Sequence, residues 1–266
     1  MGTELEARGI DTRLPLWSAR ALIEAPDVVA TIHRAYARAG ATLHTANTFR
    51  TKRRTLGSRW ESLARQAVAI ARGAVPSEHR IIGSVAPLED CYRPDLSPRD
   101  PGPEHRELAA VLADAGVDIL LCETFPHVGE AVAAVEECSA TGVTTWVAFT
   151  AGPTADLLSP SEMAAGARRA IDAGAAAVLV NCVPAKDTLP FVEALAPLGI
   201  PVGAYANAGH VDDAIGWRSP AEAGVEAYLN LARQWRDAGA TILGSCCGTG
   251  PNHIAALTGL TAPDRP

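Results

Sequence analysis

The chain has 266 residues, of which 48% are hydrophobic, and a formal net charge of −7. This length is sufficient for one large hydrophobic core, and the acidic balance argues against a nucleic-acid partner. The chain contains no apolar run of about 18 residues, which argues against a membrane span, and the polar start MGTELEARGID lacks the apolar core of a secretory signal. We therefore expect a cytoplasmic protein whose six cysteines stay reduced.

One pattern recurs four times along the chain: a helix end, then Ala-Gly, then an apolar run, then polar or reactive residues. It covers residues 36–49, 112–125, 170–183 and 235–248. The glycine suits the left-handed residue that ends a helix, and the unbroken apolar run is typical of a strand buried on both faces. Seven residues after the four glycines come Asn47, Glu123, Asn181 and Cys246. Each predicted strand thus ends on a polar or reactive group.

The remaining elements continue an alternation of strands and helices. Three further apolar runs begin at Arg80, Thr144 and Pro201, which brings the predicted strands to seven. Segments with helical apolar spacing lie between strands, and they begin at Pro103, His127, Ser159 and Ser219. The last two begin with a serine cap, a proline at the first helical position and a glutamate three residues after the cap.

This alternation predicts an α/β protein with a parallel sheet. The length favours a single (β/α)₈ TIM barrel domain over residues 1–266, and a doubly wound sheet is the alternative. Reactive groups at several strand ends favour the barrel, because barrel sites gather at the carboxyl ends of the strands. The segment Pro87–Pro103 is rich in proline and charge and is predicted to be a long loop on that face. Seven strands leave the barrel without its first strand.

Cys182, Cys246 and Cys247 follow strands that end at the same predicted barrel mouth. Three thiolates favour Zn²⁺, which in catalytic sites keeps a fourth position open, and the glycines of GSCCGTG permit the sharp turn that two adjacent ligands require. A redox pair, simple packing and a phosphate site at GTGP remain alternatives. We expect Cys91, Cys122 and Cys138 to be small buried side chains.

Glu123 is the carboxylate predicted to be buried at a strand end. Such a group needs a cation, which is either a substrate ammonium or a structural Arg or Lys. Asn47, Asn181 and Asn207 either bind a substrate carboxylate or satisfy loop backbone. The sequence pairs none of the histidines at strand ends and loops with a nucleophile, and we assign no catalytic role to those side chains: His44, His210 and His253.

The residues resemble the homocysteine S-methyltransferases over nearly the whole chain, in TANTF, GSVAP, AGVDILLCET, VNC and GSCCGTGPNHI. The stretch LWSA and the stand-alone length resemble the small enzymes that use S-methylmethionine or S-adenosylmethionine. The resemblance implies a (β/α)₈ barrel with Zn²⁺ on Cys182, Cys246 and Cys247. It also implies that homocysteine binds through its sulfur, with its ammonium near Glu123, and accepts a methyl group from a sulfonium donor to give methionine. The further candidates for binding substrate are Asn47, Thr48, Asn181 and Asn207.

The sequence departs from the family pattern at two places, which leaves alternatives for the start of the barrel and for the methyl donor. Family members usually begin with an apolar strand ending in Asp-Gly just before the stretch that matches MGTEL, and here the sequence begins at that methionine. Either the start has been placed too late or the barrel is truly open, which would leave strand edges for a homo-oligomer. His210 stands where the family often has an acidic residue, which leaves the donor open. The rival functions are methyl transfer to another thiol and a non-catalytic zinc- or thiol-binding barrel.

Overall fold

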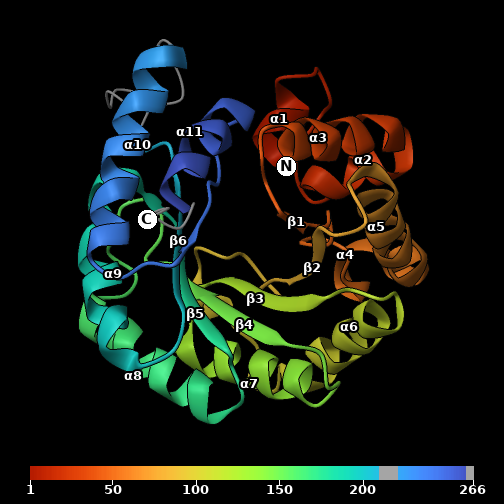
Figure 1. Cartoon of the computed structure of the whole chain (residues 1–266). Helices are drawn as coiled ribbons and strands as arrows, with labels where there is room; N and C mark the ends of the chain where they lie inside the picture. Colours follow the sequence, from red (N-terminus) through yellow and green to blue (C-terminus); the bar gives the residue numbers. More distant parts are fainter. Residues whose placement is uncertain (210–220, 262–266) are drawn as a thin grey trace.

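A computed structural model describes residues 1–209 and 221–261. Seven parallel strands form one curved sheet in chain order, with helices around its outer side (Figure 1). The strands are β1 (Leu43–Thr45), β2 (Arg80–Val85), β3 (Ile119–Phe125), β4 (Thr145–Phe149), β5 (Ala177–Pro184), β6 (Val202–Asn207) and β7 (Ile242–Leu243). All seven strands predicted from the sequence are present, and the α/β barrel class is confirmed.

Helices precede the first strand, connect successive strands and follow the last strand, and they cover the convex face of the sheet. They are α1 (Gly2–Glu6), α2 (Arg20–Glu24), α3 (Pro26–Arg38), α4 (Arg53–Leu56), α5 (Trp60–Ala74), α6 (Gly102–Asp114), α7 (Val128–Ser139), α8 (Pro160–Asp172), α9 (Leu189–Leu195), α10 (Ala221–Asp237) and α11 (Pro251–Thr261). None of the helices in the described ranges is long and apolar enough to cross a membrane.

The barrel is open on one side. Each strand pairs with the next from β1 to β7, and no pairing between β1 and β7 occurs among the described residues. The free edges are therefore Leu43–Thr45 and Ile242–Leu243. The open side of the barrel agrees with the sequence analysis, which predicted seven strands and no first strand of the barrel.

The helix ends follow the sequence signals. Gly40, Gly116, Gly174 and Gly239 all adopt positive φ, at 95°, 80°, 110° and 112°, as the left-handed end of a helix requires. Ser159 and Glu162 form the predicted reciprocal capping box at the start of α8. The second predicted cap, Ser219, lies outside the described residues.

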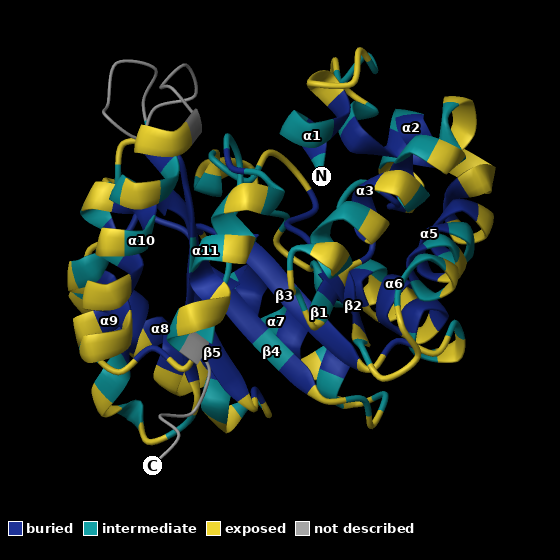
Figure 2. Ribbon diagram, turned by 45° about the horizontal axis from the view of Figure 1, so that its top comes forward, coloured by how far each residue is buried: buried dark blue, intermediate teal, exposed yellow. Residues whose placement is uncertain are grey.

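Side chains alternate along the strands between two apolar layers. On β3, Leu120 and Cys122 belong to the layer beneath the helices, whereas Ile119 and Leu121 belong to the smaller layer inside the barrel. Figure 2 shows the central strands as the buried part of the molecule. The same alternation carries Glu123, two residues after Leu121, toward the barrel interior, so the register of one strand places a candidate site residue.

A histidine cluster lies beside the open edge of the sheet. His44 Nε2 and His79 Nδ1 are 3.0 Å apart, and the ring of His33 stands edge-on to that of His44 with centroids 6.2 Å apart. His33 is 4% exposed, and its Nε2 has no hydrogen-bond partner. Burial, followed by the neighbouring His44, lowers the pKa of His33 to about 3. His33 is therefore neutral in the folded protein near pH 7.

Acidification should destabilise the fold through His33. Between pH 6.5 and about 3 the unfolded state binds a proton that the folded state excludes, so this stability is complete above pH 6.5 and is lost as the pH falls. Between about pH 7 and pH 4.5, the free energy of unfolding of the parent should fall by roughly 2 kcal/mol more than that of His33→Leu. Urea denaturation at the two pH values measures this difference. An identical loss in parent and variant would exclude His33 as its source.

Candidate metal centre

Three cysteine sulfurs converge at the carboxyl end of the sheet. The Sγ atoms of Cys182 and Cys246 lie 2.7 Å apart, those of Cys246 and Cys247 lie 3.9 Å apart, and all three lie within 4.8 Å of one another. It is the only group of three or more Cys, His, Asp or Glu with this proximity in the described ranges. The structure thus brings together the three cysteines that the sequence selected.

A strand irregularity aims Cys182 into the site. Val178 and Val180 of β5 lie in the outer layer, so strict alternation would direct Cys182 outward as well. The register between β5 and β6 shifts between Asn181 and Pro184, and Cys182 has a φ of 51°. A bulge of this kind re-aims a side chain, and positive φ in a non-glycine residue is strain that the surrounding structure must hold.

Cys246 and Cys247 are placed by backbone pairing beyond the short strand β7. The N–H of Cys246 donates to Ala206 O at 2.8 Å, and the N–H of Ala208 donates to Cys247 O at 2.8 Å. Gly248 follows with a φ of 77°, which supplies the predicted sharp turn. The buried hydroxyl of Tyr228 donates to Gly244 O at 2.9 Å and thereby fixes the approach to this turn.

The donor set of three cysteine sulfurs suits a zinc ion. Thiolates at about 2.3 Å from a tetrahedral zinc lie about 3.8 Å from one another, which is close to the Cys246–Cys247 separation, whereas the Cys182 and Cys246 sulfurs, 2.7 Å apart, would have to move apart by about 1 Å. Hydrogen bonds accepted from Cys182 and Cys246 lower the pKa of Cys247, while hydrogen bonding to Cys246 and Cys247 and then burial raise the pKa of Cys182. A divalent cation bound among the three sulfurs would favour the deprotonated form of each thiol.

A cavity of about 1060 Å³ opens over the cysteines. Cys182, Cys246 and Cys247 line it together with Glu123 and the loop residues 90–92. The loop predicted from the proline-rich segment therefore does lie on this face. The expectation for Cys122 and Cys138 is confirmed, because both are fully buried, with sulfurs 3.5 Å apart.

The expectation for Cys91 was wrong. This side chain is half-buried and lines the cavity, because the loop that carries it runs over the barrel mouth and not through the core. Burial raises the pKa of its thiol to about 12, and a charge at Cys247 acts in the same direction. Cys91 is thus a neutral thiol that lines the same cavity as the three-cysteine cluster.

Glu123 is held by two hydroxyl groups. Ser84 Oγ donates to its Oε1, Tyr205 Oη donates to its Oε2 at 3.0 Å, and the side chain is 8% exposed to the cavity. Burial raises the pKa of Glu123, although both hydrogen bonds oppose that change. No ion pair among the described residues includes Glu123. A cation entering the cavity would stabilise the ionised form of Glu123.

Ser84 and Tyr205 are site residues that the sequence reasoning missed. Both occupy inward positions of their strands: Ser84 comes two residues after the inner-layer Ile82, and Tyr205 itself packs against the inner layer. The two-residue alternation, counted along every strand and not only along the Ala-Gly pattern, would have found them.

The other predicted substrate-binding residues form hydrogen bonds with other groups of the protein. Asn181 accepts the N–H of Thr124 at 3.1 Å and donates to its Oγ1 at 2.7 Å, and Thr48 Oγ1 donates to Ser84 O at 2.9 Å. Neither Asn181 nor Thr48 is among the residues that line the cavity, whereas Asn47 and Asn207 are. Asn47 Nδ2 donates to Ser18 O at 2.8 Å, and Asn207 Nδ2 donates to Cys182 O at 3.3 Å.

Comparison with known proteins gives the family. Residues 1–260 match the family described as homocysteine S-methyltransferase. The chain belongs to the homocysteine S-methyltransferase family. It is 32% identical to the homocysteine S-methyltransferase of Escherichia coli (strain K12), over 97% of this chain and 92% of that protein. It is 28% identical to the S-methylmethionine–homocysteine S-methyltransferase BHMT2 of Pongo abelii, over 98% of this chain and 76% of that one.

Solved structures agree with this family. The metallated and oxidized forms of the homocysteine methyltransferase MmuM from Escherichia coli both superpose with a TM-score of 0.80. They are 27% and 28% identical to this chain, and each comparison covers 98% of this chain and 93% of that one. The chain therefore shares its fold with a member of this family whose structure is described as a metallated form.

The cysteine cluster should bind one zinc ion per chain. Protein purified under reducing conditions is expected to contain about one zinc by elemental analysis, and Cys246→Ala should lose at least about 90% of it, because two remaining thiolates bind zinc far more weakly. Cys138→Ala, which removes a thiol from the core, is the matched control and should keep its zinc. Equal zinc contents in both variants would contradict the assignment of the ligands.

Proposed function

We propose that this chain transfers a methyl group from a sulfonium donor to the sulfur of homocysteine and produces methionine, with Zn²⁺ as its metal. The observation that carries the proposal is that a three-cysteine cluster and a hydroxyl-bracketed carboxylate open into one cavity. An amino acid with a side-chain thiol presents a soft sulfur and an ammonium, which are the two groups that such a cavity would bind.

The sulfur end of the substrate would be held at the metal. Cys182, Cys246 and Cys247 supply three ligands and leave the cavity side free for a fourth. A bound zinc lowers the pKa of a thiol ligand, so that the thiol is nucleophilic near neutral pH. Reduced cysteines are needed for this, which fits a cytoplasmic location.

The amino-acid end would be held by Glu123. Ser84 and Tyr205 fix its two carboxylate oxygens, so the group is oriented before the substrate arrives. The substrate ammonium replaces the missing cation and compensates for the desolvation of the carboxylate. Anchoring the substrate at both ends aligns its sulfur for in-line attack, and alignment of this kind is a major source of rate.

A sulfonium donor suits the rest of the site. Its leaving group departs as a neutral thioether, so the reaction does not depend on a general acid at the leaving sulfur. The cavity has room for two amino-acid-sized ligands. Trp17 and Phe49, whose rings meet edge-on at 5.5 Å, line it together with Tyr92, and aromatic faces attract cations. The name of the Pongo abelii relative, S-methylmethionine–homocysteine S-methyltransferase, supports S-methylmethionine as the first donor to test.

Methionine formation tests the reaction. The zinc-loaded protein should convert homocysteine and S-methylmethionine to methionine, and a parallel assay with S-adenosylmethionine would rank the donors. Cys246→Ala should reduce turnover by at least about a thousandfold, since the metal would be lost. A zinc-loaded protein that gives no methionine with either donor would refute the proposed function while leaving the metal site intact.

Glu123 should govern the affinity for homocysteine. We expect Glu123→Gln to raise the KM for homocysteine by about tenfold or more, because the amide cannot neutralise an ammonium. Tyr205→Phe should raise it by a smaller factor, because one of the two orienting hydrogen bonds remains. The control is Glu137→Gln, which changes a partly buried carboxylate that pairs with Arg106 and does not line the cavity, and it should match the parent. Unchanged saturation by homocysteine in Glu123→Gln would remove Glu123 from the substrate site.

A further inference from the structure

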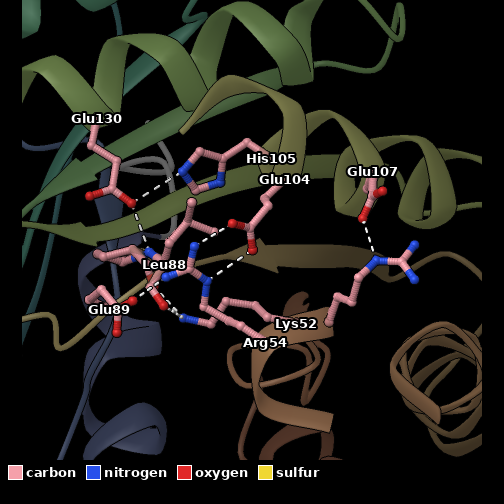
Figure 3. A network of polar contacts seen from close by, with 10 residues as sticks. Lys52, Arg54, Leu88, Glu89, Glu104, His105, Glu107 and Glu130 are labelled. Carbon is pink, nitrogen blue, oxygen red and sulfur yellow. Dashed lines mark hydrogen bonds and ion pairs between the residues drawn. The ribbon is translucent and has the colours of Figure 1, made fainter. Parts of the chain in front are cut away.

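The loop over the cavity is fixed at its root by a buried ammonium. Lys52, which precedes α4, is only 3% exposed. Its Nζ donates to the carbonyl oxygen of Pro87 and, at 3.4 Å, to that of Leu88 (Figure 3). These two residues begin the segment that follows β2 and passes over the barrel mouth. Lys52 thus joins the segment after β1 to the loop after β2.

A buried carboxylate holds the same peptide from the other side. Glu130 of α7 is 2% exposed, and its Oε1 accepts the N–H of Leu88 at 2.7 Å. The same oxygen lies 3.3 Å from Nε2 of the buried His105 on α6. Leu88 therefore has its carbonyl bound by a cation and its N–H bound by an anion (Figure 3).

A third, more exposed contact continues along the loop. Arg54 of α4 pairs with the carboxylate of Glu89 and with Glu104 of α6, donating to Glu104 Oε2 from its Nε at 2.9 Å. Residues 87–89 are consequently held by charged groups from α4 and α7, which are in turn tied to α6. We call Lys52, Arg54 and Glu130, together with the residues 87–89 that they bind, the loop clamp.

The loop clamp directly precedes the loop residues of the cavity wall. Asp90, Cys91 and Tyr92 all line the cavity beside the three cysteine ligands. The N–H of Tyr92 donates to Asp90 Oδ1 at 2.8 Å, which makes residues 90–92 one compact turn. A displacement at residues 87–89 would therefore move this part of the wall as a unit.

Stability alone does not account for the loop clamp. Burying an ammonium and a carboxylate carries a desolvation penalty, and apolar side chains of similar size usually stabilise a fold as well or better. Burial, followed by the charge of Arg50, lowers the pKa of Lys52 to about 7, which reflects that penalty. What the charged groups add is directional bonding to the backbone of one loop.

We propose that Lys52 and Glu130 are positioning residues that fix the loop 90–92 as the donor-side wall of the cavity. This inference rests on the proposed function. The methyl acceptor is anchored by groups on the sheet, at the metal ligands and at Glu123, and these do not depend on the loop. The donor would occupy the remaining part of the cavity, whose wall includes residues 90–92. The loop clamp thus determines the KM for the donor more than that for homocysteine.

The test compares Lys52→Met with Arg53→Met in the zinc-loaded, full-length enzyme. Arg53 is the neighbouring cation; it is exposed and pairs with Glu107 of α6 at 2.9 Å. Arg53→Met therefore also replaces a cation with methionine, but at a residue outside the loop clamp. Lys52→Met should raise the KM for the sulfonium donor by about tenfold and the KM for homocysteine by less than about threefold, since the misplacement affects the donor wall alone. Zinc content should stay at the parent value, and Arg53→Met should resemble the parent throughout.

Glu130 provides a second pair of variants, with rescue. Glu130→Gln keeps an acceptor for the Leu88 N–H and should retain a donor KM near that of the parent, whereas Glu130→Leu should show the defect of Lys52→Met. This pair carries the test if Lys52→Met does not fold. Equal rises in both KM values, or no rise in the donor KM, would overturn the proposal.

Alkylation of Cys91 tests the loop clamp without catalysis. In zinc-loaded protein, iodoacetamide labelling at Cys91, measured by peptide mass spectrometry, should be about fivefold faster in Lys52→Met than in the parent, because a loosened loop exposes the thiol. Unchanged labelling would overturn the proposal. If the parent makes no methionine but labelling still accelerates, the proposed function fails while the loop clamp stands.

Discussion

The site depends on the left-handed backbone of one strand residue. Cys182 would face the helices if β5 kept its alternation, and only the register shift after Asn181 directs its sulfur to Cys246 and Cys247. The residue adopts a φ of 51°, which costs about 1–3 kcal/mol for a side chain with a Cβ. The rest of the structure must hold that conformation, and an ion bound to all three sulfurs would contribute further.

A second irregular strand is linked to the first. Thr124 of β3 also has positive φ, at 64°, where β3 and β4 shift register, and it directly follows Glu123. Asn181 bridges the two strands, since its side chain both accepts from and donates to Thr124. The position of the Glu123 carboxylate and that of Cys182 are thereby coupled through one buried amide. Asn181 therefore contributes to the geometry of the cavity although it is not one of the residues that line it.

The sequence was informative wherever one regular rule decided the outcome. Seven strands and the helix-ending glycines follow from apolar runs and positive-φ preference, and the spacing from Gly116 placed Glu123 at a strand end. The convergence of three cysteines followed from strand ends meeting at one face. Alternation also governs Ser84 and Tyr205, which were missed because the search followed only the Ala-Gly pattern.

Other features depend on contacts distant in sequence. Alternation predicts the wrong direction for Cys182, because a bulge is a local exception that no single residue signals. Cys91 lies in a loop whose path is set by Lys52 and Glu130, which are 35 or more residues from the Pro87 and Leu88 groups they bind. Periodicity carries no information on such pairs, since loops lack a regular repeat. The loop over the site is therefore the part least predictable from the sequence.

The strands of the sheet and the loop over the cavity contribute different parts of the cavity wall. Under the proposed function, groups on the sheet bind what every thiol amino-acid acceptor shares, a sulfur and an ammonium, and strand pairing on both sides fixes the positions of these groups. The donor side is built from a loop held by a few charged contacts at its root. A loop can change in sequence without disturbing the pairing of the strands. Such an arrangement allows the acceptor to stay constant while the donor varies, because the two binding surfaces rest on separate supports.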